Sequence, residues 1–182
     1  LQMQKRDSDL WPSPETGRGE SAVTCSLIAS YQAFAAWGIT AQVRDMENFD
    51  WNNADGRIAV IPDMICIPSS MIPRMRSFVE KGGKLIVTGR SGYFDENMRC
   101  AFMGGHPLAD VLGGELAEFR YTDDYFSIGG LDSHLWRGII KPSEDAEVIV
   151  RNGSEASALR HRYGEGEVVW FPSMIELGAY HR

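Results

Sequence analysis

The chain has 182 residues, which is the length of one domain and is enough to bury a hydrophobic core without disulfides. With 43% hydrophobic and 24% charged residues it has the composition of a globular protein, which excludes disordered and fibrous classes. The formal net charge of -7 argues against a nucleic-acid partner, and the lack of any run of about 20 apolar residues argues against a membrane span.

The first long element predicted is a helix from Ser21 to Trp37, which follows an edge strand and a Pro- and Gly-rich loop over residues 1–20. Gly38 stands where a left-handed cap would end this helix. Apolar residues recur at helical spacing, so we expect one face to be buried. The residues of that face are Val23, Leu27, Ile28, Tyr31, Phe34 and Ala35.

Three predicted strands follow. Ile39 to Arg44 alternates apolar and polar residues, as in a strand with one buried face. Arg57 to Ile61 and Lys84 to Thr88 are short apolar runs, typical of strands covered on both faces. We therefore expect these three segments to lie in one central, mostly parallel sheet.

A crossover helix is predicted from Ser70 to Lys81, between the last two strands. Ser69 or Ser70 should cap it, Pro73 is tolerated in its first turn, and Gly82-Gly83 should end it. Strand, helix and strand in this order form a βαβ unit, in which the two strands run parallel. The apolar face of the helix comprises Ile72, Met75, Phe78 and Val79.

The C-terminal half contains shorter signals. Pro107 to Leu112 predicts a short helix closed by Gly113-Gly114, and Glu115 to Tyr121 predicts a strand. The last three predicted strands are Glu147 to Arg151, Ala158 to Tyr163 and Glu167 to Phe171, the final two joined in a hairpin at Gly164 to Gly166. The fold class is therefore α/β and flavodoxin-like, a single domain over residues 1–182 with a C-terminal β-hairpin.

The loop Gly89, Arg90, Ser91 and Gly92 is the candidate ligand site, because it leaves the carboxyl end of a central strand. In amidotransferase-like folds a nucleophilic Cys stands at this turn, but Arg90 is always protonated and cannot attack a carbonyl. We therefore predict no catalytic residue. Two alternatives stay open: a small-molecule hydrolase with an atypical nucleophile, Ser91 or Cys100, beside a histidine, and a non-catalytic module that binds a sugar or an anion at Arg90.

No metal or cofactor is predicted. Cys25, Cys66 and Cys100 are odd in number and widely spaced, which fits neither a zinc site nor a disulfide framework. Free thiols of this kind favour a cytoplasmic protein, while a secreted or periplasmic parent stays open. The carboxylate pairs of the chain, such as Asp95-Glu96 and Asp123-Asp124, are typical of solvated loops.

Several short segments follow one another in a distinctive order. They are Tyr31-Gln32-Ala33-Phe34, Gly38-Ile39, Ile58 to Pro62, Phe78 to Gly92, Asp95-Glu96-Asn97, Pro107-Leu108, Leu112 to Glu115 and Tyr163 to Val169. In this order they resemble the middle domain of glycoside hydrolase family 42 β-galactosidases, often called the trimerisation domain. That resemblance implies a class I glutamine amidotransferase-like fold without amidotransferase activity.

The resemblance also implies a role and partners. In this family the catalytic glutamates lie on a preceding (β/α)8 barrel, which needs about 250 residues and cannot be contained in this chain. We therefore expect a non-catalytic accessory domain cut from a larger glycoside hydrolase of carbohydrate metabolism. Its partners would be sister subunits in a homo-oligomer, with a trimer as the implied form, and the parent's catalytic barrel.

Two segments rich in aromatic and Met residues are the candidate interfaces. Phe102 and Met103 lie between an acidic turn and Gly104-Gly105, and Tyr125 and Phe126 follow Asp123-Asp124. Side chains of these types are enriched at interface centres. The alternative is that both segments fold back over the edge of the sheet as a small satellite core.

Overall fold

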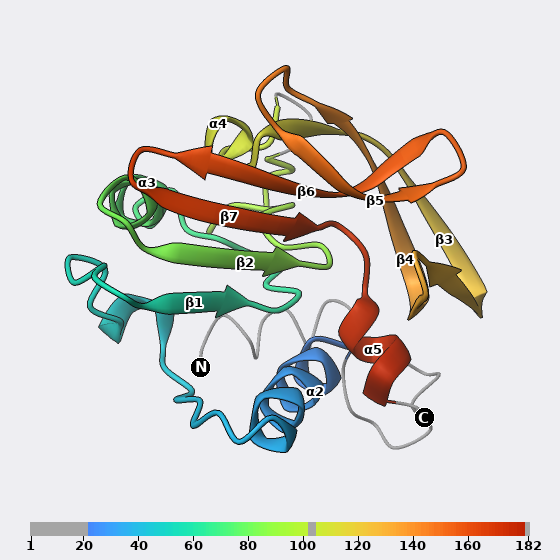
Figure 1. Cartoon of the computed structure of the whole chain (residues 1–182), viewed down its shortest axis with the longest axis horizontal. Coiled ribbons are helices and arrows are strands. Elements are labelled where there is room, and N and C mark those ends of the chain that lie inside the picture. Colours follow the sequence, from blue (N-terminus) through green and yellow to red (C-terminus); the bar gives the residue numbers. More distant parts are fainter. Residues whose placement is uncertain (1–21, 102–104, 181–182) are drawn as a thin grey trace.

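The computed structural model describes residues 22–101 and 105–180. Its helices are α2 (Ala22–Ala36), α3 (Ile72–Glu80), α4 (Ala109–Leu112) and α5 (Ile175–Tyr180), with a short 3-10 turn η2 (Met46–Asn48). Its strands are β1 (Ile58–Ile61), β2 (Lys84–Thr88), β3 (Gly114–Ile128), β4 (Leu131–Pro142), β5 (Glu147–Asn152), β6 (Glu155–Tyr163) and β7 (Gly166–Phe171). The strands form one seven-stranded sheet in the order β1-β2-β7-β6-β4-β3, with β5 paired to β6 (Figure 1).

The predicted βαβ unit is confirmed. β1 and β2 pair in parallel from Ile58 opposite Lys84 to Ile61 opposite Val87, and α3 connects them. The predicted face of α3 is buried at Met75, Phe78 and Val79. The predicted serine cap is wrong: Met71 is the N-cap without a side-chain hydrogen bond, because the Ser69 main chain and hydroxyl both donate to Glu96 instead.

The predicted mostly parallel sheet is wrong. Only β1 with β2 and β2 with β7 pair in parallel, and every other pairing in the described sheet is antiparallel. The physical reason is connection length, since a parallel crossover needs a dozen or more residues. β3 to β7 are joined instead by short turns, as at Gly129-Gly130, where both glycines have positive φ (59° and 85°). The predicted hairpin of β6 and β7 is confirmed, but β7 lies inside the sheet.

The strand predicted from Ile39 to Arg44 is also wrong. Within the described chain this segment pairs with no strand, and its two largest apolar side chains, Ile39 and Val43, are 51% and 58% exposed. A segment of alternating apolar and polar residues forms a strand only where a neighbouring strand offers main-chain hydrogen bonds.

Helix α2 matches its predicted span, but only its N-terminal half is buried. Ala22, Val23, Cys25, Ser26 and Ala29 are covered, whereas Tyr31 is 48% exposed. The predicted apolar face is therefore correct at Val23 and wrong at Tyr31 and Ala35, while its other members are half-buried: Leu27, Ile28 and Phe34. α5, which the sequence did not predict, packs against this helix and against β4.

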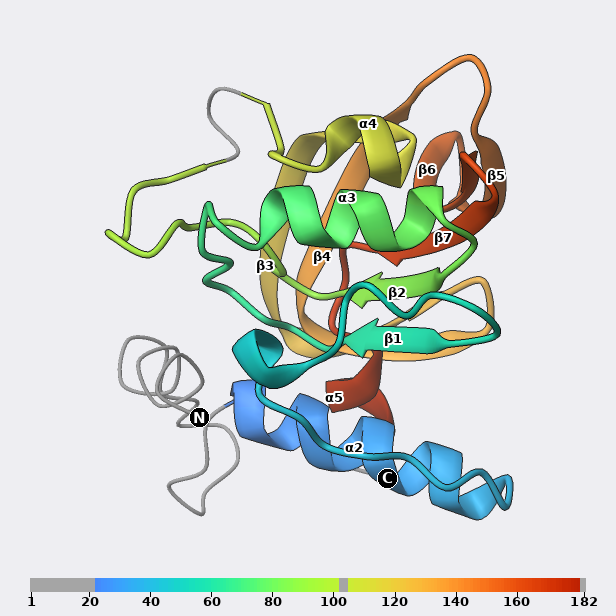
Figure 2. The ribbon, with the colours of Figure 1, turned by 90° about the vertical axis from the view of Figure 1, so that its left-hand side faces the viewer.

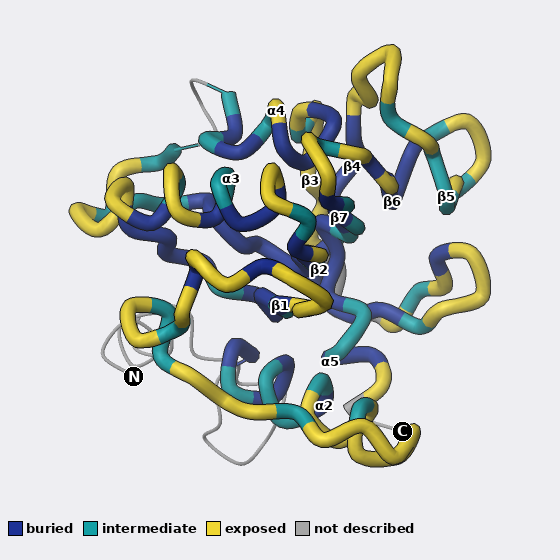
Figure 3. The backbone as a smooth tube through the Cα atoms, turned by 60° about the vertical axis from the view of Figure 1, so that its left-hand side comes forward, coloured by how far each residue is buried: buried dark blue, intermediate teal, exposed yellow. Residues whose placement is uncertain are grey.

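The helices lie on two sides of the strands. Figure 2 shows α3 and α4 above β1, β2 and β7, and α2 and α5 below them. One buried cluster fills the space at α3 and α4 and includes Phe78, Leu112 and Trp170. A second cluster joins α2 and α5 to β4 through Val23, Trp136 and Leu177. Figure 3 shows buried chain running through the centre of the molecule.

Candidate functional site

The candidate ligand loop lies at the carboxyl ends of the parallel strands. Because β1 and β2 end at the same edge, the loops that follow them run side by side. The Gly92 amide donates to the carbonyl of Met64 at 2.9 Å, and the Phe94 amide donates to the carbonyl of Ile65 at 3.0 Å. These bonds tie the loop 89–94 to the loop 62–67.

Arg90 is held in a buried ion pair with Asp63. Its Nε donates to Asp63 Oδ1 at 3.0 Å, its Nη2 donates to Oδ2 at 2.6 Å, and its main-chain amide also donates to Oδ1 at 2.8 Å. Asp63 is fully buried and Arg90 is 5% exposed. The guanidinium therefore binds the carboxylate in a two-pronged contact that charged pairs favour.

Gly89 makes room for this pair. Its φ is +60°, and a Cβ at this position would lie 2.4 Å from Asp63 Oδ1. Asp63 itself has a left-handed backbone, with φ of 46°. The turn is thus shaped around the Asp63 side chain, and any larger residue at position 89 would push the carboxylate away from Arg90.

Ser91 bridges the two strand ends. Its hydroxyl accepts from the Met64 amide at 2.8 Å and donates toward the carbonyl of Thr88 at 2.7 Å. Ser91 is 1% exposed. The hydroxyl is thus occupied by main-chain groups, which is the arrangement of a structural serine.

His106 contacts Ser91 through the main chain. The Leu108 amide donates to Nδ1 at 3.1 Å, so the proton lies on Nε2, which donates to the carbonyl of Ser91 at 2.9 Å. Burial lowers the pKa of His106 to about 4, against the smaller opposing effect of the Ser91 carbonyl. The histidine is therefore a neutral hydrogen-bond donor at neutral pH.

A second buried carboxyl lies on α5. Glu176 is half-buried as a residue, but its Oε2 has no solvent contact and no hydrogen-bond partner among the described residues. Burial raises the pKa of Glu176 to about 7. A carboxyl in this state can carry a proton near neutral pH.

The remaining chemical candidates stay apart. Cys100 is half-buried, Cys25 and Cys66 are buried thiols, and the Cys66 Sγ donates to the Met98 Sδ at 3.3 Å. Across residues 22–101 and 105–180 there is no cluster of three or more His, Cys, Asp or Glu side chains suited to a metal ion. The helices of these ranges are all too short or too polar to cross a membrane.

A row of exposed aromatic side chains lies on β3. Phe119, Tyr121 and Tyr125 are 41%, 57% and 49% exposed, and we call these three residues the β3 aromatic face. Tyr121 lies opposite Trp136 on β4, and Tyr125 lies opposite His134. Phe119 and Tyr121 are two residues apart and point to the same side of β3, and a bulge between Thr122 and Tyr125 sets the register that places Tyr125 opposite His134.

The Trp136 ring packs against two rings of this face. Phe119 stacks on the Trp136 ring at 4.6 Å between centroids, and Tyr121 meets it edge-on at 6.4 Å. The Trp136 Nε1 donates to the Tyr93 hydroxyl at 3.2 Å. The Arg90 guanidinium lies 5.8 Å from the centre of the same ring. Trp136 thus joins the buried ion pair to the exposed aromatic row.

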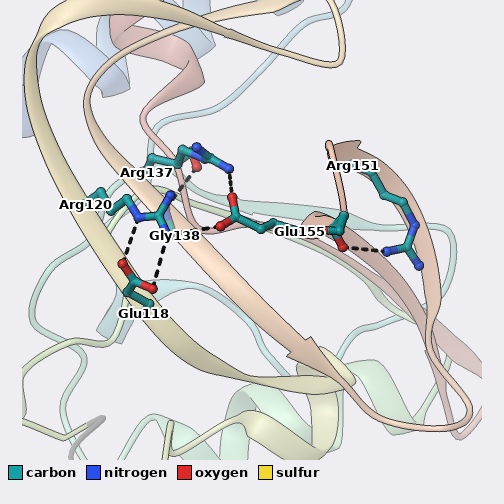
Figure 4. Close-up of polar contacts among 8 residues, drawn as sticks. Glu118, Arg120, Arg137, Gly138, Arg151 and Glu155 are labelled. Carbon is teal, nitrogen blue, oxygen red and sulfur yellow. Dashed lines mark hydrogen bonds and ion pairs between the residues drawn. The ribbon is translucent and has the colours of Figure 1, made fainter.

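The opposite side of β3 carries charges. Arg120 donates to Glu118 at 2.7 Å and to Glu155 at 3.0 Å, and Arg137 also pairs with Glu155 (Figure 4). Arg120 and Arg137 are directly opposite on neighbouring strands, where like charges repel. Glu118 and Glu155 offset that repulsion, so this side of the hairpin is a solvated network.

The predicted interface residues have different places in the structure. Tyr125 is exposed in the β3 aromatic face, and Phe126, the next residue of β3, is half-buried. Phe102 and Met103 lie outside the described residues. Phe119 and Trp136 were not among the residues predicted for the two candidate interface segments. The alternation of Glu118, Phe119, Arg120 and Tyr121 was the available signal, since it places both rings on one side of a strand.

The sequence of this chain is similar to parts of known proteins. Residues 15–179 match the family model of the β-galactosidase trimerisation domain. The chain is 38% identical over 159 residues to β-galactosidase BbgII of Bifidobacterium bifidum, covering 77% of this chain and 22% of that protein. It is 27% identical over 172 residues to β-galactosidase BglY of Alicyclobacillus acidocaldarius, covering 83% and 24%. The chain thus spans under a quarter of the length of these two curated relatives.

Solved structures share the fold. The β-galactosidase of Bacillus circulans sp. alkalophilus matches with a TM-score of 0.72 and 20% identity, over 86% of this chain and 26% of that one. The cytoplasmic protein STM1381 of Salmonella typhimurium LT2 matches with a TM-score of 0.59 and 13% identity, over 84% of this chain and 86% of that one. The fold therefore occurs both as part of long chains and as nearly the whole of a short one.

Proposed function

Because this chain belongs to the β-galactosidase trimerisation domain family, a non-catalytic accessory domain, we propose that it joins the subunits of a β-galactosidase-like glycoside hydrolase. Its partners in this proposal are sister subunits and the catalytic barrel of its parent. The observation that carries the proposal is the β3 aromatic face, whose rings are half exposed and rigidly backed by Trp136 and His134. Rigid aromatic anchors are typical of interface centres.

Light scattering of the chain tests this role. We expect the wild-type chain to associate and Tyr121→Ser to lower its mass toward the 20.3 kDa of one copy, with an unchanged circular dichroism spectrum. Ile58→Ser is the matched control, since Ile58 is 56% exposed on β1, outside the β3 aromatic face. The proposal is wrong if Tyr121→Ser and Tyr125→Ser both keep the wild-type mass.

The proposal includes catalytic inertness of this segment. Arg90 stands where a nucleophile would be needed, and the Ser91 hydroxyl is bonded to main-chain groups. We expect the purified chain to hydrolyse neither glutamine nor chromogenic galactosides. Turnover that disappears in Ser91→Ala or Cys100→Ala would contradict this and would favour the hydrolase alternative.

The finer fold assignment belongs to the same proposal. Parallel β1 and β2, the crossover α3 and the turn Gly89 to Gly92 are the elements expected of an amidotransferase-like core, and they support that assignment. A ligand role for Gly89, Arg90, Ser91 and Gly92 stays a prediction. Sulfate or galactose that raises the melting temperature of wild type but not of Ser91→Ala would support it.

A further inference from the structure

A second group of exposed apolar side chains lies on the C-terminal half of α2 and on the chain that follows it. Tyr31, Trp37, Ile39 and Val43 are 48%, 85%, 51% and 58% exposed, and we call these four residues the helix-end patch. Figure 3 shows the chain after α2 as a long exposed run. Large apolar side chains exposed together mark interaction surfaces in soluble proteins.

The helix-end patch and the β3 aromatic face are well separated. The first turn of α2, with Ala22 and Val23, packs in the same cluster as Trp136, which supports the β3 aromatic face. α2 has 15 residues and spans about 22 Å at about 1.5 Å per residue, so Trp37 lies at the far end. Trp37, beyond the C-terminal end of α2, is therefore separate from the β3 aromatic face, whose supporting Trp136 packs at the N-terminal end of the helix.

Three copies in a ring require such a pair of surfaces. A self-complementary interface is related by a two-fold axis and is satisfied by two copies. A closed ring of three copies uses a head-to-tail interface, in which each copy contributes two different surfaces. The family to which this chain belongs is described by trimerisation, so two unlike surfaces are what the assembly needs.

We propose that the helix-end patch of one copy binds the β3 aromatic face of the next copy. This inference rests on the proposed function and assigns both sides of its interface. Trp37 is the most exposed of the large apolar side chains in the described residues, and Tyr121 is the most exposed ring of the β3 aromatic face. Trp and Tyr are the residue types that most often dominate binding energy, and such residues tend to meet across an interface.

Mixing two variants tests this pairing. Trp37→Ser loses the helix-end patch but keeps the β3 aromatic face, and Tyr121→Ser has the reverse defect. Each variant alone should associate at least tenfold more weakly than wild type. An equimolar mixture should give a species with the mass of two copies, because one intact interface remains and the ring cannot close.

The outcomes separate this inference from the proposed function. A mixture that stays as monomeric as each variant alone, or a Trp37→Ser variant that keeps the wild-type mass, overturns the pairing while the role of Tyr121 stands. A monomeric wild-type chain at about 100 μM overturns both. Ile58→Ser, outside both surfaces, should keep the wild-type mass, and circular dichroism should show both test variants folded.

Discussion

The Trp136 ring contacts Arg90 of the buried ion pair and also Phe119 and Tyr121 of the β3 aromatic face. The ion pair is buried, whereas the aromatic face is exposed to solvent. The pair consists of charged residues, the type usually sought in an active site, and it is buried and mutually satisfied. The face consists of rings with no catalytic chemistry, and they are half exposed. In this molecule the chemically suggestive residues hold the fold, and the chemically inert ones form part of the exposed surface.

Removing one member of the buried pair tests its structural role most strongly. Asp63→Ala should lower the free energy of unfolding by about 3–5 kcal/mol, because it leaves the Arg90 guanidinium buried without its carboxylate. Urea denaturation measures this. Asp63→Leu combined with Arg90→Met should recover only part of the loss, since an apolar pair removes both charges but leaves the Arg90 main-chain amide without its acceptor. A loss below about 1 kcal/mol would show that the pair is dispensable to the fold and available for another role.

Trp136→Leu should affect both regions. It removes the ring on which Phe119 stacks and the donor to the Tyr93 hydroxyl, so we expect a loss of about 3 kcal/mol in the free energy of unfolding. It should also weaken association. Trp51→Leu is the matched control, because Trp51 is equally well buried in the other cluster and should destabilise without changing association. If both variants weakened association equally, the effect of Trp136→Leu could not be assigned to its contact with the β3 aromatic face.

Glu176→Gln should change how stability depends on pH. The folded pKa is raised to about 7 from an ordinary 4.5, so the contribution of Glu176 is lost as pH rises from about 4.5 to about 7. Glutamine cannot ionise, and it should therefore raise the free energy of unfolding by about 3 kcal/mol at pH 8 and leave it unchanged at pH 4. The exposed Glu47→Gln is the control. The same gain at both pH values would contradict this account.

The smallest change in stability is expected at the exposed face. Tyr125→Ser should lower the free energy of unfolding by about 1 kcal/mol, because the half-exposed ring loses its stacking on His134. It should nevertheless lower the mass seen by light scattering. A loss of stability as large as that of Trp136→Leu would mean that Tyr125 belongs to the core of its own chain.

The sequence predicts the N-terminal part of the sheet well, because its signals are local. Gly82-Gly83 and the apolar runs beside it define α3 and β2, and both are confirmed. β4 was missed because its buried face includes Ser133 and His134, which hide the apolar pattern. The antiparallel pairings were not predicted because β4 was not recognised, so the short turns that join it to β3 and β5 were not recognised either.

The candidate site shows the same limit. Arg90 was identified from its place after a strand, but its partner Asp63 is 27 residues away, and only the parallel pairing brings the two together. Tyr125 was predicted as an interface residue because it lies in a segment rich in aromatic residues. The alternation of residues 118–121 indicates that Phe119 and Tyr121 share one side of the strand, but the position of Tyr125 opposite His134 depends on the bulge after Thr122, which no residue pattern indicates.

The position of β7 constrains how the chain is made. β7 pairs with β2 on one side and with β6 on the other, although it is the last strand to be synthesised. Until residue 171 has emerged, the β1 and β2 pair has an open inner edge, and the β3 to β6 strands have nothing to join them to it. Such non-local closure slows folding and leaves strand edges exposed to other chains. A nascent chain that is slowed before β7 is therefore the form of this protein most prone to aggregate.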